Sequence, residues 1–375
     1  MKALFNITQT SIFGIFFGIF LIALSFSTLR VTYGFGVIEL IFLIILLLYI
    51  LNYFFLNSEQ FHLFPFAPLI YVMLFVTPLT IVNINYEFYG SEFSTALALM
   101  LATTVGAIVS TFNKNFRHGL AFGVGICCLA SVLFIIFSGS LVETIIRFAF
   151  LSGNPNTLAL YSLCACFIVC LLYPKNLLRS IFVVAAVFYG IISLSDSLFL
   201  ALVVGSLFGI ACYLLKHGLL FALLISFGII FLIFIINMEL NIINALNDLW
   251  VSADEGGTRI SLLIHGIEAY LESPFLGHGA GAFSGYFHPF GRFEAHNTYV
   301  DLLTIGGPFL TLIFLLPLVI SIPSLYRNNE FLSLAFLMAI IIFAFFHFTA
   351  RHPVIWAVWG ICIGSILSKE FLVKD

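Results

Sequence analysis

The sequence predicts an all-helical integral membrane protein with about twelve transmembrane helices and one large loop on the outer side of the membrane. Of the 375 residues, 62% are hydrophobic and only 8% are charged, and the mean hydropathy is +1.18. A soluble domain carries roughly 25% charged residues, so lipid must surround most of this chain. The length of the apolar runs and the distribution of the lysines give the number of spans and their direction.

Twelve apolar runs separated by polar breaks are the predicted spans, and they form a single transmembrane domain over residues 1–375. Most approach the 20 or so apolar residues that cross a bilayer. The first run has no small-residue cleavage site after it and is interpreted as a span, not as a removed signal peptide. The approximate limits are 10–29, 35–56, 63–82, 93–112, 119–138, 155–173, 178–194, 198–215, 218–237, 298–323, 331–348 and 353–368.

The basic residues predict the orientation. If both termini are cytoplasmic and twelve spans alternate, nine of the fourteen lysines and arginines, including every lysine, face the cytoplasm, as the positive-inside rule expects. The remaining basic residues are all arginines. Because a guanidinium binds phosphate through two parallel hydrogen bonds, this set indicates an anionic ligand outside; arginines that only snorkel to the interface would give the same pattern. The outer arginines are Arg30, Arg147, Arg259, Arg292 and Arg351.

The one long segment outside the predicted spans is the loop 238–297, inserted between spans nine and ten. Apolar residues at spacings of three and four predict a helix from Thr258 to Glu272, with Arg259 off the apolar face. Arg259 lies at the helix N-terminus, where free amides already favour an anion. It is a candidate phosphate ligand, and the alternative is a solvated surface arginine. The predicted apolar face consists of Ile260, Leu263, Ile264, Ile267 and Leu271.

A glycine-rich stretch, Gly277-His278-Gly279-Ala280-Gly281, follows this helix. Its glycines permit sharp turns and close backbone approach, but no βαβ unit surrounds it, so it is not a dinucleotide site. The histidines lack the paired spacing of a zinc site, and the sequence predicts neither a metal nor another cofactor. No basic patch indicates nucleic acid. The aromatic residues beyond the glycines favour either a sugar-stacking platform or an interfacial belt; they are Phe283, Tyr286, Phe287, Phe290 and Phe293.

The end of the loop carries the candidate for a general base. His296 and Asn297 directly precede the tenth span, and Asp301 falls within its first turns. A carboxylate at that depth is costly and usually functional, and we expect Asp301 to orient the imidazole. Histidine accepts a proton near neutral pH. Glu294 is the rival base, and a third interpretation is that His296 only anchors the loop at the interface.

Several of these motifs together resemble the O-antigen ligase and polymerase superfamily. The matching stretches before the tenth span are Gly256-Gly257-Thr258-Arg259, Ser273-Pro274-Phe275-Leu276-Gly277-His278-Gly279-Ala280-Gly281 and His296-Asn297-Thr298-Tyr299, with Gly306-Gly307 inside that span. An earlier match is Arg147 followed by Gly153-Asn154-Pro155-Asn156 at the start of the sixth span. These motifs cover roughly a third of the chain.

The resemblance implies a membrane glycosyltransferase of the GT-C class in the bacterial inner membrane. Such enzymes move a glycan from an undecaprenyl-diphosphate carrier to an acceptor on the periplasmic side, with inversion and without a metal. By position, Arg147 and Arg259 would hold the diphosphate and His296 would be the base. Asn156, Asn297 and Asp301 would support them.

One departure from the family affects the diphosphate site. The family usually has a Ser-Arg pair at the outer start of the eighth span, whereas this chain reads Ser195-Asp196-Ser197 there. Arg30, Arg292 or Arg351 could replace the missing arginine.

Three functions stay open at this point. The first is a ligase that transfers O-antigen or a similar glycan to lipid A–core, which the single dominant outer loop favours. The second is an O-antigen or exopolysaccharide polymerase of the same superfamily. The third is a polysaccharide flippase or transporter, which predicts ionisable residues deep within many spans and repeat symmetry; here the polar residues gather at one surface.

Overall fold

The computed structural model describes residues 9–25, 30–32, 35–36, 98–99, 102–106, 109–110, 114–138, 145, 154–218, 253–281, 284 and 293–367. The predicted span 63–82, nearly all of spans 35–56 and 218–237 and the first part of the outer loop lie outside these residues. So do Arg147, Arg292 and most of the aromatic residues of the loop.

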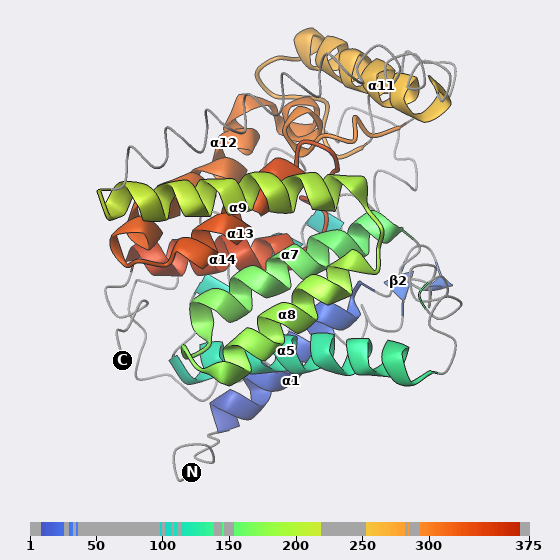
Figure 1. Ribbon diagram of the computed structural model, residues 1–375. Helices are drawn as coiled ribbons and strands as arrows, with labels where there is room; N and C mark the ends of the chain where they lie inside the picture. Colours follow the sequence, from blue (N-terminus) through green and yellow to red (C-terminus); the bar gives the residue numbers. More distant parts are fainter. Residues whose placement is uncertain are drawn as a thin grey trace, which may run out of the picture.

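Helices occupy most of the described residues of the predicted spans (Figure 1). The polar breaks that bound the runs become the helix ends; Asn154 and Asn176, for example, cap two of them with their side chains. The helices are α1 (Gln9–Ala23), α5 (Lys114–Phe137), α7 (Pro155–Leu172), α8 (Leu177–Ile191), α9 (Asp196–Lys216), α11 (Ala253–Glu272), α12 (Thr298–Arg327), α13 (Phe331–Phe343) and α14 (Pro353–Leu367).

One short antiparallel strand pair departs from the all-helical prediction. β1 (Arg30–Thr32) pairs with β2 (Phe35–Gly36), with Arg30 opposite Gly36 and Thr32 opposite Phe35. The predicted start of a span at residue 35 is therefore wrong. Valine, threonine and phenylalanine favour extended backbone, a preference that the continuous apolar run after residue 35 concealed.

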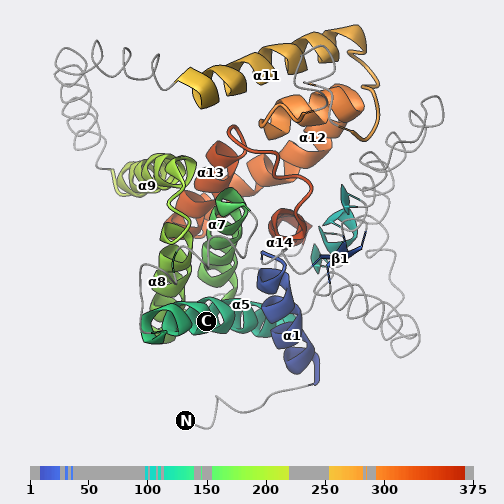
Figure 2. The same cartoon turned by 90° about the vertical axis from the view of Figure 1, so that its right-hand side faces the viewer.

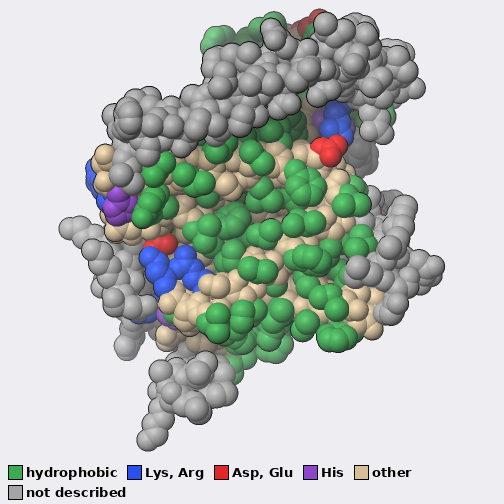
Figure 3. All heavy atoms as spheres, in the orientation of Figure 1, with side chains coloured by type: hydrophobic (Ala, Val, Ile, Leu, Met, Phe, Trp, Pro, Cys, Tyr) green, Lys and Arg blue, Asp and Glu red, His purple; other side chains and the backbone are tan. Residues whose placement is uncertain are grey.

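The chain is a membrane protein by the length and character of its helices. Within the described residues α5, α7, α9 and α12 are long and apolar enough to cross a membrane, and α1, α8, α13 and α14 are shorter apolar helices. Their outer sides form a broad hydrophobic surface (Figure 3). Soluble proteins rarely expose such a surface, and lipid would cover it here. Exposed apolar side chains on these helices include Phe134 on α5, Val184 and Phe188 on α8, and Phe199, Val203 and Ile210 on α9.

Small residues bring two pairs of helices into close contact. On α1 and α5, Gly14 and Gly18 face Gly119 and Gly123, so backbone meets backbone. On α9, Gly205 and Gly209 likewise pack closely against Ala335 and Ala339 of α13. Four-residue spacing places both glycines of a helix on one side, which is how membrane helices pack without a hydrophobic driving force between them.

Helix α7 forms the centre of the described bundle and positions the site. Nearly all its residues from Leu158 to Leu172 are buried, between α8, α5, α13 and α14. Pro155 occupies its first turn, where a missing N–H costs nothing, and the Asn154 side chain accepts the backbone N–H of Asn156 at 2.9 Å. The proline and the cap fix where the helix starts and hold Asn156 at that end of the bundle.

The opposite end of the bundle gathers basic residues. Glu330 lies 2.6 Å from Lys175 and 3.7 Å from Arg179, and Nζ of Lys216 donates to the last carbonyls of α12, those of Tyr326 and Arg327, at 3.0 and 2.9 Å. These cations belong to the set that the sequence predicts on the cytoplasmic side, and the N-terminus of α7 lies at the other end.

Helix α12 is broken at Gly306 and Gly307, the second of which has φ 68°. The predicted single span 298–323 therefore needs correction: residues 298–305 form a short helical piece, and the 20 residues from Pro308 to Arg327 form the long one. The glycine-rich stretch fills the break, since the amides of His278 and Gly279 donate to the carbonyls of Thr304 and Ile305 at 2.7 and 2.9 Å.

Helix α11 runs across the view in Figure 2, in which α9 and α14 are seen nearly end-on. It begins at Ala253, earlier than predicted, and ends at Glu272 as predicted. Leu262, Gly266 and Ala269 are buried, and Gly266 meets Ala295 and Val300, beside the start of α12. The predicted apolar face is turned the other way: Ile260, Ile264, Ile267 and Leu271 are exposed.

Candidate functional site

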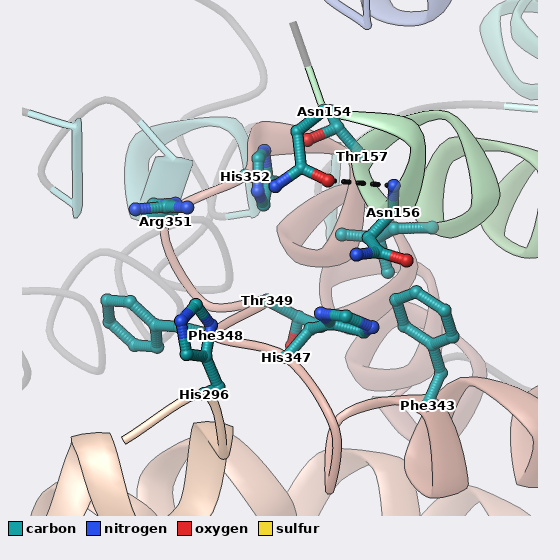
Figure 4. A pocket seen from close by; sticks show the side chains of 11 residues that line it. Asn154, Asn156, Thr157, His296, Phe343, His347, Phe348, Thr349, Arg351 and His352 are labelled. Carbon is teal, nitrogen blue, oxygen red and sulfur yellow. Dashed lines mark hydrogen bonds between the residues drawn. The ribbon is translucent and has the colours of Figure 1, made fainter. Parts of the chain in front are cut away.

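A pocket opens where three segments meet at the N-terminal end of α7. It contains about 330 Å³ of atom-free space, open solvent included. Figure 4 shows Asn154 and Asn156 on one side and the side chains of His296, His347 and Arg351 around the same space. The segments are the start of α7, the loop 293–297 before α12 and the loop 344–352 between α13 and α14.

The loop that carries His296 is held in a defined conformation. Asn297 caps α12 by accepting the backbone N–H groups of Tyr299 and Val300 at 3.0 and 3.2 Å. Asp301 is buried, and its carboxylate accepts the backbone N–H groups of Ala295 at 2.7 Å and Asn297 at 3.2 Å. The expectation that Asp301 orients the imidazole is therefore corrected: it orients the backbone around the histidine, because buried amides need an acceptor.

The two loops are tied to each other by hydrogen bonds. The Asn297 side chain donates to the carbonyl of Phe345 at 3.0 Å, and the Thr298 hydroxyl donates to the carbonyl of His347 at 2.5 Å. The Thr298 hydroxyl also accepts the amide of Thr349 at 2.8 Å. His296 and His347, about 50 residues apart in the sequence, are thus parts of one rigid rim.

Two guanidinium groups act on this rim. Arg351 forms an ion pair with Glu294. Arg259 lies on the same side of α11 as Leu262 and Gly266, because residues three or seven positions apart fall on the same side of a helix. Gly266 touches the loop at Ala295, and the charge of Arg259 reaches the imidazole of His296. Arg259 and Arg351 therefore bring two guanidinium groups to this rim, and each could pair with an anion.

The pKa of His296 is lowered from its usual 6.5, first by burial, then by the charges of Arg259 and Arg351. The imidazole is therefore neutral at pH 7 and has a lone pair that can accept a proton. Burial raises the pKa of Glu294, and Arg351 partly opposes this. Since Glu294 forms an ion pair with Arg351 and does not line the pocket, the geometry favours His296 as the base.

A polar network that the sequence interpretation missed completes the pocket. Ser195 donates to Oδ1 of Asn156 at 2.7 Å, Ser195 and Ser197 lie 2.9 Å apart, and Ser197 lies 2.7 Å from Nε2 of His347. It occupies the start of α9, where the family's arginine would be. Burial lowers the pKa of His347 to about 3, as do, to a lesser extent, the charges of Arg259, His296 and Arg351.

His352 lines the pocket beside Asn154 and was also missed. Burial, with the charges of Arg351 and His347, lowers its pKa to about 3. The available signal was the density of ionisable residues: His347, Arg351 and His352 fall within six positions between two apolar runs. No motif marked them, and only the fold brings them to His296.

The structure thus brings several predicted residues together. Asn156, His296 and Arg351 line the pocket; Asn297 and Asp301 hold the loop, and Arg259 contributes charge. Arg147 and Arg292 lie outside the described residues, as does the side chain of Arg30. Among the described residues no group of three or more histidine, cysteine, aspartate and glutamate side chains could hold a metal ion. His278 is structural, with Nε2 2.7 Å from the carbonyl of Ala269.

In comparisons with known proteins, no protein-family model matches the chain and no curated protein matches its sequence.

Proposed function

We propose that the protein is an O-antigen ligase-like glycosyltransferase. It would transfer a glycan from undecaprenyl diphosphate to a lipid A–core acceptor at the periplasmic face of the bacterial inner membrane, by a metal-independent reaction with inversion. The observation that carries the proposal is a neutral histidine, His296, in a pocket that Arg351 also lines, with the charge of Arg259 acting on the same imidazole.

The charges suit a diphosphate leaving group. As the bond between the sugar and the diphosphate breaks, its electron pair leaves with the phosphate oxygen, and negative charge grows there. Cations aimed at that position stabilise the transition state more than the substrate. Arg259 and Arg351 supply two such cations, with Arg147 as the third in our proposal. Arg351, which Glu294 orients, would take the role of the arginine missing at Ser195-Asp196-Ser197.

The histidine suits the attacking group. A sugar hydroxyl is a weak nucleophile, and a positioned base that accepts its proton as the new bond forms accelerates such reactions roughly 10²–10⁴-fold. In the proposed step the acceptor oxygen bonds to the anomeric carbon on the face opposite the diphosphate, and the hydroxyl proton passes to His296. The depressed pKa keeps His296 unprotonated and ready at pH 7.

Two alternatives differ in product. A polymerase would join one carrier-linked glycan to another, and a flippase would move the carrier-linked glycan without forming a glycosidic bond. A base and cations gathered in one pocket at one end of the bundle favour a transferase. The single large loop 238–297 favours the ligase over the polymerase.

Reconstitution tests the proposal. The purified protein in liposomes is given an undecaprenyl-diphosphate-linked glycan and lipid A–core, and glycosylated core and free undecaprenyl diphosphate are measured. We expect transfer by the wild type and a loss of roughly 10²–10⁴-fold in His296→Gln, with a far smaller loss in Glu294→Gln. His217→Gln, at the opposite end of the bundle, is the matched control. Glycan joined to glycan identifies a polymerase, and movement without transfer overturns the proposal.

The proposed orientation has its own test. Single cysteines at Ser252 and Lys374 in intact cells are treated with a thiol reagent that does not cross the inner membrane. We expect labelling at Ser252 alone. Labelling at Lys374 alone would reverse the membrane orientation and remove the periplasmic site.

A further inference from the structure

The network beside His347 fixes which of its ring nitrogens carries the proton. Each serine hydroxyl has a single proton. Ser195 gives its proton to Oδ1 of Asn156, so in the 2.9 Å contact between the serines Ser197 is the donor. Ser197 has then used its own proton, and in its 2.7 Å contact with His347 the donor is Nε2–H of the imidazole.

A neutral imidazole with its proton on Nε2 has a lone pair on Nδ1. Within the described part of the chain Nδ1 of His347 has no protein hydrogen-bond partner, and the ring lines the pocket with His296 and Arg351. Burial lowers the pKa of His347 to about 3, so the ring is uncharged at pH 7. Nδ1 is therefore an acceptor without a protein partner, on a ring that lines the pocket.

The arginines and His347 suit different parts of the proposed ligand. Arg259 and Arg351 offer only N–H donors, which match phosphate oxygens. A lone pair repels phosphate and needs a donor, and the donors of a glycan are its hydroxyl groups and the N–H of an acetamido group. His347 therefore matches the sugar next to the diphosphate or the sugar that attacks it.

We propose that Nδ1 of His347 accepts a hydrogen bond from a hydroxyl or acetamido N–H of a bound sugar, with Ser197, Ser195 and Asn156 as positioning residues that hold the imidazole in the required tautomer. This rests on the proposed transferase function. It gives the serines at the start of α9 a role in sugar recognition, while the diphosphate is left to the arginines.

Two isosteric substitutions separate this role from a structural one. Asparagine places an amide oxygen where Nδ1 lies, and glutamine places its amide where Nε2 lies. If Nδ1 binds sugar, His347→Asn keeps the acceptor and His347→Gln loses it, and we expect His347→Gln to raise the sugar substrate's KM about tenfold more than His347→Asn does. If His347 only supports Ser197, glutamine is the better substitute and the order reverses.

Kinetics with each substrate varied in turn identify the source of the sugar. A rise in the KM of the carrier-linked donor assigns Nδ1 to the donor sugar, and a rise in the acceptor KM assigns it to the acceptor sugar. Thermal unfolding shows whether each variant is folded. Equal KM values for wild type, His347→Asn and His347→Gln would overturn the proposal.

Nitrogen-15 NMR of histidine side chains tests the tautomer without any enzymatic activity. The signal that disappears in His347→Asn belongs to His347, and at pH 7 we expect a protonated Nε2 and an unprotonated Nδ1. In Ser197→Ala the Nε2–H loses its acceptor, and we expect a mixture of both tautomers. A protonated Nδ1 in the wild type refutes the proposal even if transfer is observed, and absence of transfer with the expected tautomer refutes the transferase function instead.

Discussion

Asp301 holds the backbone on both sides of His296, through the amides of Ala295 and Asn297. His296 itself has φ 53°, a left-handed conformation that costs a residue with a Cβ roughly 1–2 kcal/mol. Such a conformation persists only where its surroundings determine it. One carboxylate therefore keeps the proposed base in an unfavourable backbone conformation that aims it into the pocket.

Asp301→Asn should lower kcat by roughly 10–100-fold, the scale of a small misplacement of a catalytic group. The amide can accept only through its oxygen, so one of the two backbone N–H groups loses its partner. Single-turnover transfer with saturating donor measures the effect, and thermal unfolding shows whether the fold is kept. Asp196→Asn, an exposed residue at the start of α9, is the control. An unchanged kcat would mean that the loop holds its conformation without the carboxylate.

The pH dependence of transfer should report His296 and respond to Arg351. A base works above its pKa, so we expect a constant rate at neutral pH and a decrease only below pH 6.5, because the pKa is lowered in the folded protein. Arg351→Gln removes one of the charges that lower it, and the acid limb should move to higher pH. Arg327→Gln at the opposite end should leave the profile unchanged. If the acid limb of the rate profile does not move in Arg351→Gln, a group other than His296 controls the decrease in rate.

Arg259→Lys separates charge from geometry. Lysine keeps the positive charge near His296, so the acid limb of the rate profile should stay close to that of the wild type. It loses the planar fork that binds two phosphate oxygens, so the KM of the carrier-linked donor should rise about tenfold or more. Steady-state kinetics from pH 5 to 8 measure both effects, and Arg147→Lys should behave alike in donor binding. A donor KM equal to that of the wild type would remove Arg259 from the diphosphate site.

Gly205→Leu should destabilise the bundle by about 1–3 kcal/mol or more, the usual cost of overpacking. A Cβ at Gly205 would meet the backbone of Ala335 and lie 2.8 Å from Cβ of Ala339, so α9 and α13 would have to separate. Chemical unfolding in detergent measures the change. Val203→Leu, which adds bulk on the exposed side of the same helix, is the control and should be nearly neutral.

The sequence predicted the helices well where polar residues interrupt the apolar runs. Asn154-Pro155 marked the start of α7, and α8 begins after its cap Asn176 at Leu177, one residue before the predicted span. The prediction of helix limits failed within continuous apolar runs. The strand at Phe35 and the break at Gly306 both lie in apolar sequence, so the hydropathy of the run does not reveal them. Composition reports how far a segment prefers lipid, and it carries little information about backbone direction inside that segment.

The candidate site was predicted in part for a similar reason. His296 and Asn156 belong to recognisable local motifs, and both line the pocket. His347 and His352 reach it through the packing of α13 and α14 against α7 and α12, contacts that no local pattern encodes. Asp301 was singled out for its depth in the span, and the prediction had it orient the side chain of His296, because a sequence does not show which backbone amides need an acceptor.

The break in α12 has a consequence for how the protein would tolerate different bilayers. The piece from Pro308 to Arg327 is about 30 Å long, close to the hydrocarbon thickness, and helices meet thicker or thinner membranes by tilting. In a continuous helix any tilt would swing the loop with His296 through the same angle. Here Gly306 and Gly307 form a joint, while Asn297 and Thr298 fasten the short piece to the loop between α13 and α14. The depth of the proposed site is thereby separated from the tilt of the piece Pro308–Arg327, so the proposed transfer should depend little on acyl-chain length.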